Sequence, residues 1–478
     1  MRDDYEVIIG LEVHAELSTN TKIYCNCTTK FGADPNTQCC PICTGMPGVL
    51  PVLNEKVVEY AVKMGLATNC EISRFSKQDR KNYFYPDLPK AFQTSQYDLP
   101  LCEHGHVDIN VDGKKKTIGI TRIHIEEDAG KLIHDAYTGD TLVDMNRCAV
   151  PLIEIVSEPD IRSASEAIEY MQTLKSTLEY LEICDCKMQE GSLRCDVNLS
   201  VRKKGETKFG TRTETKNLNS FKAIQNSIEF ETKRQIQVLE EGGTIYQETR
   251  RFDDAKGIGY AMRTKEDAHD YRYFPEPDLA PIVLSEEYIE NIKNNLPEMP
   301  NVKKTRYISE YGIPEYDADI ITSSKEVAKY FEKVADISKN PKIAANWIMG
   351  DFASKLNETE ITISQSKIKP EDLAELIKLI DNNTISSKIA KTVFEEMFET
   401  GKEPKVIVDE KGLVQITDEN ALKEIVEKVV ENNPKSVEDY KAGRDKAIGF
   451  LVGQIMKETK GKANPGIVNK MLIEILSK

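Results

Sequence analysis

The sequence predicts an α+β protein, and three observations support this fold class. Short β-like runs alternate with turns from residue 5 to about residue 281, and helical stretches at 163–181 and 221–239 interrupt them. These strands and helices do not follow the regular βαβ alternation that is typical of a parallel sheet. After about residue 285 the apolar residues recur at helical spacing, so we expect the rest of the chain to be helical.

The length and the changes in composition predict three domains. With 478 residues, the chain is too long for one compact core. A Pro- and Asn-rich segment, NNLPEMP, marks the first boundary, and the last part of the chain contains separate amphipathic segments that suit a small bundle. We therefore predict a sheet-containing catalytic domain at 1–294, a helical domain at 295–404 and a helical tail domain at 405–478.

The composition excludes some classes of protein. No window approaches the run of roughly 20 apolar residues that a membrane span needs, and the N-terminus lacks the apolar core of a signal peptide. We therefore expect a cytoplasmic protein with no membrane partner. The net charge of -15 argues against a protein coated in nucleic acid, although local basic surfaces remain compatible with it.

The opening strand-like segment, VIIGLEVHAEL, has two different faces. Side chains alternate along a strand, so its apolar residues share one face and Glu12, His14 and Glu16 share the other. Two carboxylates that flank an imidazole suit a divalent cation. A solvated strand face is the alternative explanation for the same pattern.

Later strands carry further carboxylates. In SLRCDVNLSVR, Asp196 lies on the polar face, whereas Glu154 in PLIEIVSEPD interrupts an almost wholly apolar run. A carboxylate in that position should be paired, bound to a metal or at a strand edge, because burying it alone is costly. In GITRIHIEEDAG, strict alternation places Glu127 with Ile123 and Ile125, so either a bulge occurs or Glu127 reaches inward. Together these strands predict a sheet whose polar face holds metal ions and a polyphosphate.

The sequence has no Walker-type loop to bind a nucleotide. The GxxxxGK[ST] pattern is absent, and the GIGY segment at 257–260 is only a fragment of a GxGxxG pattern. If ATP binds, carboxylate-held Mg²⁺ and basic side chains must neutralise its phosphates. Each candidate cation could also be an ordinary surface charge; the candidates are Arg80, Lys81, Arg212, Lys216, Arg250 and Arg251.

The cysteines predict a metal site. All 11 lie within residues 25–195, and with no signal peptide we expect reduced thiols. A C-x-C pair and a C-x-x-C pair can supply four thiolates to one tetrahedral, structural Zn²⁺. The best set leaves Cys39 as a spare and consists of Cys25, Cys27, Cys40 and Cys43. A group of buried free thiols is the alternative.

Several long motifs resemble those of one enzyme family. They are IGLEVHAEL, DRKNYFYPDLPK, GITRIHIEEDAGK, PLIEIVSEPDIR, EGSLRCDVNLSVR, TETKNLNSF, DYRYFPEPDL, KAIGFLVGQIMK and KANP. In this order they are similar to the GatB/GatE family, which supplies the B subunit of the bacterial-type aspartyl/glutamyl-tRNA(Asn/Gln) amidotransferases. The resemblance spans essentially the whole chain. It implies a glutamine-synthetase-like cradle domain, a helical domain and a small helical tail.

The resemblance also implies a reaction. Members of the family use ATP to phosphorylate the side-chain carboxylate of Glu-tRNA(Gln) or Asp-tRNA(Asn), and ammonia then displaces the phosphate. The ammonia comes through a channel from a separate amidase subunit, and a small belt-like subunit completes the complex. We find no amidase-like nucleophile arrangement in this sequence. We therefore expect ATP, Mg²⁺, both partner subunits and a misacylated tRNA to act with this chain.

Site residues follow from the resemblance position by position. It implies that Mg²⁺ is bound by His14, Glu127 and Glu154. Glu12 and Asp196 would be companions or ligands of a second ion, and Lys81 matches a channel-gate position that pairs with Glu127. The candidates for nucleotide contacts are Arg80, Arg212, Lys216 and Asn217.

The tail domain is basic where the rest of the chain is acidic. Residues 441–470 contain seven basic and two acidic side chains, which predicts an attraction for tRNA phosphates. A solvated helical face is the alternative. The residues that we assign to tRNA binding are Lys441, Arg444, Lys446, Lys457, Lys460 and Lys462.

Two other functions compete with this interpretation. An ATP-dependent ligase for a free amino acid would explain the acidic sheet but leaves the basic tail without a role. A non-enzymatic, zinc-containing RNA-binding module would explain the cysteines and the tail but leaves Glu12, His14, Glu154 and Asp196 without a role. Deletion of the tail tests the first alternative, and replacement of His14 or Glu154 tests the second.

Overall fold

The computed structural model describes residues 4–135, 137–264, 270–415, 419–441, 444, 446–459 and 462–476. The chain up to Met299 forms one compact unit, and the chain from Pro300 forms a second. One large hydrophobic core lies in the first unit and two smaller cores lie in the second. None of the helices in the described ranges has both the length and the apolar character needed to cross a bilayer.

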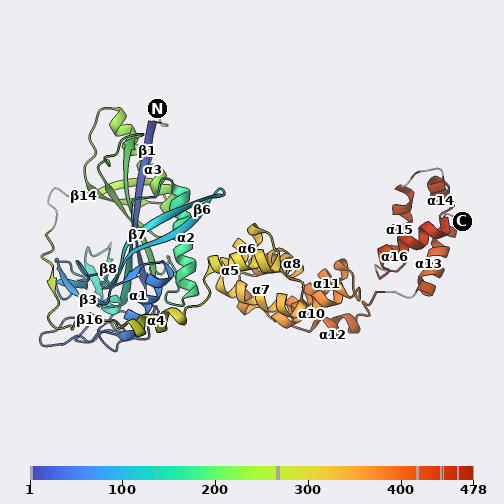
Figure 1. The fold of residues 1–478 in the computed structure, drawn as a ribbon, viewed down its shortest axis with the longest axis horizontal. Helices are drawn as coiled ribbons and strands as arrows, with labels where there is room; N and C mark the ends of the chain where they lie inside the picture. The colour runs from blue at the N-terminus through green and yellow to red at the C-terminus, as the bar shows by residue number, and fades with distance from the viewer. Residues whose placement is uncertain are drawn as a thin grey trace. The chain divides into compact units, whose positions relative to one another are not determined.

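A nine-stranded sheet forms the centre of the first unit (Figure 1). In spatial order its strands are β14 (Ile258–Thr264), β13 (Glu248–Asp253), β12 (Thr213–Leu218), β11 (Leu193–Lys203), β1 (Tyr5–Glu16), β10 (Pro151–Ser157), β7 (Lys114–Glu127), β6 (Cys102–Val111) and β2 (Glu71–Ile72). Neighbouring strands are antiparallel, except for the parallel pair of β12 and β13. This largely antiparallel sheet, followed by helices, confirms the predicted α+β class.

Helices cover one face of the sheet. Helix α2 (Ala164–Tyr180) packs on β6, α3 (Phe221–Glu240) packs on β11, and α1 (Glu55–Ala67) packs on β7 and β6. Helices α2 and α3 also contact each other, and α4 (Glu286–Asn294) packs on α1 (Figure 1). The apolar residues of β1 join this core, since Ile9 and Val13 are fully buried. The polar residues of β1 therefore lie on the opposite face, as its alternation predicts.

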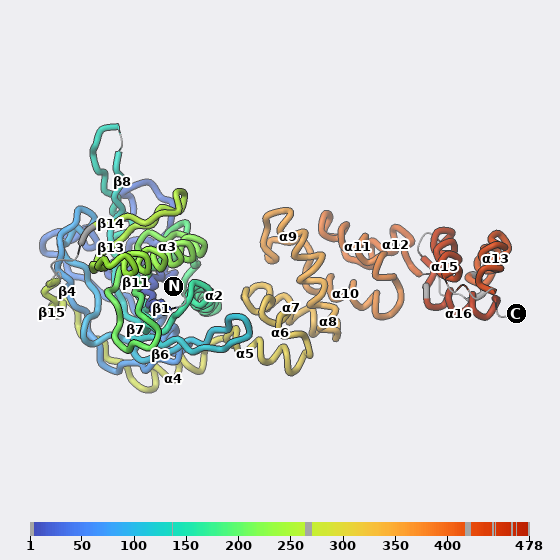
Figure 2. The backbone as a smooth tube through the Cα atoms, turned by 90° about the horizontal axis from the view of Figure 1, so that it is seen from above, coloured from blue at the N-terminus to red at the C-terminus, as the bar shows by residue number. Residues whose placement is uncertain are grey.

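Short strands extend the first unit. A three-stranded sheet consists of β15 (Phe274–Pro275), β4 (Asp79–Asn82) and β5 (Phe92–Ser95), and β5 contacts β7. Strand β16 (Ile282–Val283) pairs with β3 (Phe75–Ser76). Strands β8 (Lys131–His134) and β9 (Thr141–Asp144) form a hairpin that projects from the rest of the unit (Figure 2), and the 3-10 turn η2 (Met145–Arg147) follows it.

The elements of the second unit, within its described residues, are helices joined by turns and loops. Helix α5 (Pro300–Arg306) packs on η3 (Tyr307–Tyr311) and α6 (Glu315–Thr322). The first core of this unit is formed by η3 and α6 with α7 (Lys325–Ser338), α8 (Pro341–Trp347), η4 (Ile348–Phe352), α9 (Ala353–Thr359), η5 (Ile363–Gln365), α10 (Pro370–Asp381), α11 (Ser387–Thr400) and α12 (Pro404–Glu410). Its second core is formed by α13 (Glu419–Asn432), α14 (Pro434–Lys441), α15 (Lys446–Glu458) and α16 (Pro465–Leu476). The first core spans residues 307–408 and the second spans residues 422–476.

The predicted domain boundaries at 294/295 and 404/405 remain predictions. The first lies at the end of α4, a few residues before the break between the compact units. The second falls inside α12, whose Ile407 and Val408 are buried in the first helical core. The packing therefore groups α12 with the helices that precede it.

Candidate active site and cysteine centre

The polar face of the large sheet gathers most of the predicted acidic and imidazole side chains. In the register of β1 and β11, Glu12 lies opposite Asp196. In the register of β1 and β10, His14 lies opposite Glu154, which in turn lies opposite His124 on β7. Laterally paired residues point to the same side of a sheet. The pairing of four strands thus places these five side chains together on the face that the helices leave open.

His14, Glu126 and Glu154 form a first group of potential metal ligands. His14 Nε2 lies 3.6 Å from Glu126 Oε1 and 3.6 Å from Glu154 Oε2. One ligand atom from each residue lies within 4.8 Å of the other two. An imidazole nitrogen and two carboxylate oxygens at this spacing fit one divalent cation.

His124 adjoins this group and influences its charge. Its side chain is 2% exposed, and its Nε2 lies 3.2 Å from Glu154 Oε2. Burial by itself would lower the pKa of His124, but the charge of Glu154 and hydrogen bonds to Glu126 and Glu154 raise it to about 9. Burial would raise the pKa of Glu154, but His124, His14 and Lys81 hold it well below its usual value. Glu154 is therefore a carboxylate at neutral pH, as a metal ligand must be.

Glu126, rather than Glu127, joins His14 and Glu154. Glu127 accepts a hydrogen bond from Thr94 N at 2.8 Å and pairs with the ammonium group of Lys90. The geometry therefore does not bring Glu127 into the magnesium set that the resemblance implied. The sequence pattern that points to Glu126 is the alternation of β7, because Glu126 lies two residues after His124 and so shares its face.

Lys81 does not pair with Glu127 in this structure. Its Nζ lies over two aromatic rings, 5.0 Å from the centroid of Tyr271 and 5.7 Å from that of Tyr83. Its positive charge nevertheless acts on the first group of potential metal ligands, since Lys81 helps to lower the pKa of Glu154. The position expected for a gate cation opposite Glu127 is taken by Lys90, which no pattern in the sequence singled out.

Glu12, Asp196 and Glu214 form a second acidic group beside the first. One carboxylate oxygen from each lies within 4.8 Å of the others. Lys216 Nζ lies 2.6 Å from Asp196 Oδ2 and 3.0 Å from Glu214 Oε1, and Asn198 donates to Glu12 at 2.8 Å. Burial and the nearby carboxylates, Glu154 first among them, raise the pKa of Glu12. An added cation would relieve this crowding of negative charge.

The other predicted nucleotide contacts differ in their surroundings. Arg80 forms two hydrogen bonds of 2.7 Å to the carboxylate of Glu276 and lies 4.2 Å from the ring centroid of Phe92. Its charge is thus already paired. Arg212 is exposed, and Lys216 belongs to the second acidic group.

Asn217, which directly follows Lys216 in β12, lines a cavity of about 540 Å³. The cavity lies at the start of α3, where Ser220 caps the helix by accepting a hydrogen bond from Ala223 N. In the parallel register of β12 and β13, Lys216 lies beside Arg251, which also lines the cavity. The other lining residues are Asn219, Phe252, Asp253, Asp254 and Tyr260.

A third polar cluster lies at the end of β1 and contains two carboxyl groups and two arginines. Asp128 contacts both Arg147 and Arg194, and Arg147 Nη2 lies 3.1 Å from Glu16 Oε1. Burial favours a higher pKa for both acids. The two arginines outweigh burial at Asp128 and lower its pKa to about 2, whereas burial and Asp128 raise the pKa of Glu16 to about 8. One acid is thus ionised and the other protonated at neutral pH.

This cluster predicts a pH-dependent effect of replacing Glu16 by Gln. Glu16 ionises in the unfolded chain at about pH 4.3 but in the folded protein only near pH 8. It therefore contributes most stability below the unfolded pKa and loses that contribution as pH rises to about 8, while Asp128 stays ionised throughout. We expect Glu16→Gln to stabilise the protein by about 1–3 kcal/mol more at pH 9 than at pH 5. Thermal unfolding at both pH values measures this difference, and an equal effect at both would contradict the assigned pKa.

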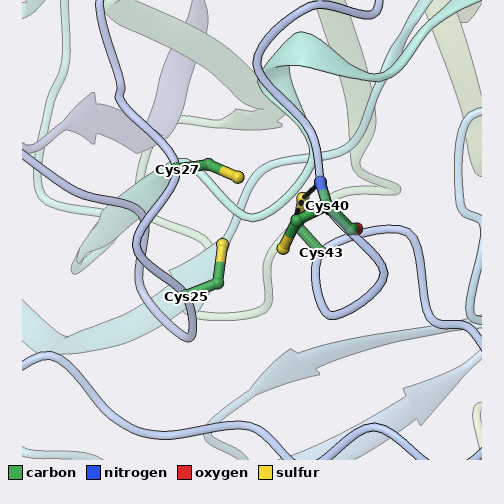
Figure 3. Close-up of side chains that lie close together, drawn as sticks. All are labelled: Cys25, Cys27, Cys40 and Cys43. Atoms are coloured by element: carbon green, nitrogen blue, oxygen red, sulfur yellow. Dashed lines mark hydrogen bonds between the residues drawn. The ribbon is translucent and has the colours of Figure 1, made fainter.

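The four predicted cysteines come together in one cluster (Figure 3). Their sulfur atoms all lie within 4.8 Å of one another, and Cys40 Sγ and Cys43 Sγ are 3.9 Å apart. In a tetrahedral site with Zn–S bonds of about 2.3 Å, neighbouring sulfurs lie about 3.8 Å apart. The donor set therefore fits such a metal, and Cys39 stays outside it, as predicted.

The thiols have unequal pKa values. A hydrogen bond from Cys25 and the charge of Lys22, partly opposed by burial, bring the pKa of Cys43 to about 5. The pKa of Cys25 is raised, first by its hydrogen bond with Cys43 and then by burial. A thiolate at Cys43 is the form that binds metal.

Comparison with known proteins identifies the family. Residues 7–290 match the family profile of the GatB/GatE catalytic domain, and residues 329–476 match that of the GatB domain. The chain belongs to the GatB family. The catalytic-domain match contains both acidic groups and the cysteine centre described above.

Curated members of the GatB family align with nearly the whole chain. The B subunit of the aspartyl/glutamyl-tRNA(Asn/Gln) amidotransferase of Caldicellulosiruptor bescii is 65% identical over 99% of this chain and 100% of its own length. Proteins with the same name from Caldanaerobacter subterraneus subsp. tengcongensis and Carboxydothermus hydrogenoformans are 65% and 58% identical, each over 99% of this chain and 100% and 99% of their own lengths. The resemblance inferred from the motifs is therefore confirmed.

The GatB domain match includes the predicted tRNA-binding tail. Lys441 is exposed at the end of α14, and Lys446 and Lys457 are exposed on α15. Arg444 is exposed and lies 3.0 Å from Asp439, and Lys462 is half-buried. Lys460 lies outside the described residues. Their role in tRNA binding remains a prediction.

Proposed function

We propose that this chain is the kinase and transamidase subunit of a tRNA-dependent amidotransferase that converts Glu-tRNA(Gln), Asp-tRNA(Asn) or both into the amide forms. The observation that carries the proposal is the polar sheet face, where two groups of carboxylates lie with imidazole and lysine side chains. The full-length relatives, named as B subunits of aspartyl/glutamyl-tRNA(Asn/Gln) amidotransferases, support it. Because its substrates would be tRNA and ATP, we place the protein in the cytoplasm.

The chemistry explains why an acidic face is needed. A carboxylate resists attack by ammonia because oxide is a poor leaving group, whereas a phosphorylated carboxylate can release phosphate. Phosphoryl transfer from ATP depends on positioning and on neutralisation of the phosphoryl oxygens, and bound Mg²⁺ supplies that neutralisation. His14, Glu126 and Glu154 would hold one such ion, and Glu12 with Asp196 and Glu214 would hold another.

The remaining residues of the face would orient the two substrates. Lys216, now between Asp196 and Glu214, can turn toward a phosphate when a cation takes those carboxylates. The cavity of about 540 Å³ next to it would accept the nucleoside, with Asn217 and Arg251 as polar contacts and Tyr260 as an aromatic wall. Paired with Glu276, Arg80 would shape the three-stranded sheet rather than contact the nucleotide.

The ammonia would come from partner subunits. We assign its production to a separate amidase subunit, with a small third subunit in the same complex, because the full-length relatives are named as one lettered subunit of a larger enzyme. Glu127, which directly follows Glu126 in the chain, forms an ion pair with Lys90, and we assign to this pair a role in admitting ammonia. The four cysteines would hold a structural Zn²⁺, since a site with four protein ligands leaves no position for a substrate.

ATP hydrolysis by the complex of this chain with its amidase partner tests the proposal. We expect Mg²⁺-dependent hydrolysis that requires misacylated Glu-tRNA(Gln) or Asp-tRNA(Asn) and is not supported by free glutamate or aspartate. Hydrolysis that is equally fast with the free amino acids would instead indicate a small-substrate ligase. An intact complex without ATP hydrolysis would contradict the kinase role.

The basic tail leads to a separate prediction. We expect the double variant Lys446→Glu/Lys457→Glu to raise the KM for misacylated tRNA about tenfold at moderate salt, with little change in kcat. The lost contacts to tRNA phosphates weaken tRNA binding but do not alter the chemical step. The dependence of tRNA affinity on salt should also become less steep. The control is Lys378→Glu, an exposed charge reversal on α10. An unchanged KM in the double variant would favour a solvated helical face.

A further inference from the structure

A completely buried lysine lies against the cysteine centre. Lys22 is 0% exposed, and its Nζ lies 3.7 Å from Cys43 Sγ and 3.5 Å from the carbonyl oxygen of Met145. It is one of the largest fully buried side chains in the described residues. Within those residues, no hydrogen bond or ion pair joins its Nζ to a carboxylate. Among the described residues, the side-chain group that accepts a hydrogen bond from Lys22 is therefore the sulfur of Cys43.

A lysine in this position needs an explanation. Lysine is cationic at neutral pH, and a buried charge without a partner is costly, so buried lysines are normally paired with acids. One carbonyl dipole and one thiol are weak compensation for it. Hydrogen bonds hold the backbone of this turn, because Lys22 N donates to Cys27 O at 2.9 Å and Asn54 Nδ2 donates to Thr21 and to the carbonyl oxygen of Lys22.

The charge of a filled cysteine centre supplies the missing partner. Four thiolates around one divalent ion carry a net charge of -2, which is itself unfavourable in a buried site. Cys25 and Cys43 are buried and Cys27 and Cys40 are half-buried, so solvent screens only part of that charge. A lysine ammonium that donates to one of the sulfurs would offset part of it and fix the orientation of that ligand.

We propose that Lys22 is the counter-ion of the cysteine centre. Its ammonium donates a hydrogen bond to Cys43 Sγ and offsets half of the net negative charge of a tetrathiolate-bound divalent ion. The buried lysine and the bound metal then stabilise each other. This inference rests on the proposed metal binding by the four cysteines but not on the proposed reaction. It makes Lys22 part of a site for thiophilic divalent ions such as Zn²⁺, Co²⁺ and Cd²⁺.

The nearly isosteric variant Lys22→Met tests the proposal through metal affinity. We expect the apparent Kd for Zn²⁺, measured by competition with a chromophoric chelator, to rise about 10- to 100-fold, as is typical when a hydrogen bond to a metal ligand is lost. The matched control is Lys30→Met, which removes an exposed lysine from the same cysteine loop and should leave the Kd unchanged. Equal Kd values for wild type and Lys22→Met would overturn the proposal.

Thermal unfolding separates a counter-ion from a lysine that only packs. In the full-length metal-free protein, Lys22→Met removes a buried charge without a strong partner, so its Tm should equal or exceed that of wild type. In the Zn²⁺-saturated protein its Tm should fall below that of wild type. A similar decrease in both states would mean that Lys22 only fills space, and would contradict the proposal. If wild type itself binds no Zn²⁺, both the metal assignment and the role of Lys22 fail, while the proposed reaction on the sheet face remains open to its own test.

Discussion

Replacing Glu154 by Gln is expected to lower the tRNA-dependent ATP hydrolysis of the assembled enzyme by at least about 100-fold. Gln keeps the shape of the side chain but removes the negative charge that faces both His14 and His124. The first metal group would then keep only Glu126 as an anionic ligand, and His124 would lose its closest counter-ion. Both changes weaken binding of a divalent cation at the place where the phosphoryl charge must be neutralised.

The measurement is ATP hydrolysis with saturating misacylated tRNA over a range of Mg²⁺ concentrations. We expect part of the lost activity to return at high Mg²⁺, because weaker ion binding can be overcome by mass action. Glu71→Gln is the matched control, since Glu71 is an exposed glutamate on β2 of the same sheet. A Glu154→Gln enzyme with normal activity and normal Mg²⁺ dependence would remove the metal group from the mechanism.

Replacing Cys43 by Ser is expected to abolish stoichiometric zinc binding and to lower the stability of the first unit by about 3–5 kcal/mol, or roughly 10 °C in Tm. Cys43 is the most buried of the four clustered cysteines and the one with a pKa of about 5. A hydroxyl does not replace a thiolate as a zinc ligand at neutral pH. The loop between Cys25 and Cys43 would then lose the bond that closes it onto the sheet.

Zinc content by mass spectrometry and thermal unfolding of the full chain measure these effects. Cys39→Ser provides the control within the same loop, because Cys39 lies next to Cys40 but outside the cluster. It should keep one zinc per chain and the wild-type Tm. Loss of zinc in Cys39→Ser together with retention in Cys43→Ser would reverse the assignment of ligands.

The local patterns in the sequence were sufficient to predict part of the candidate site. Alternation along β1 places Glu12 and His14 on one face whatever lies around the strand, because the period of two is a property of the extended backbone. The spacing of the cysteines likewise restricts which thiols can reach one ion, and the structure brings together the set chosen from that spacing. Alternation along β7 places Glu126, rather than Glu127, on the polar face with His124. The choice of Glu127 as a metal ligand came from the resemblance.

Other members of the site could be found only after the chain had folded. Glu214 meets Glu12 and Asp196 because β12, β11 and β1 are neighbours in the sheet, although about 200 residues separate Glu12 from Glu214 in sequence. The pairing of Lys90 with Glu127 follows from the contact of β5 with β7.

By itself, the sequence determined the class of the fold, the faces of its strands and the set of four cysteines that lie together. The tertiary structure decided which carboxylates lie together, which lysine pairs with Glu127 and where Lys22 is buried. The physical reason is that periodicity and spacing act over a few residues along the chain. The order and register of strands, in contrast, depend on the burial of apolar faces against helices that are distant in sequence.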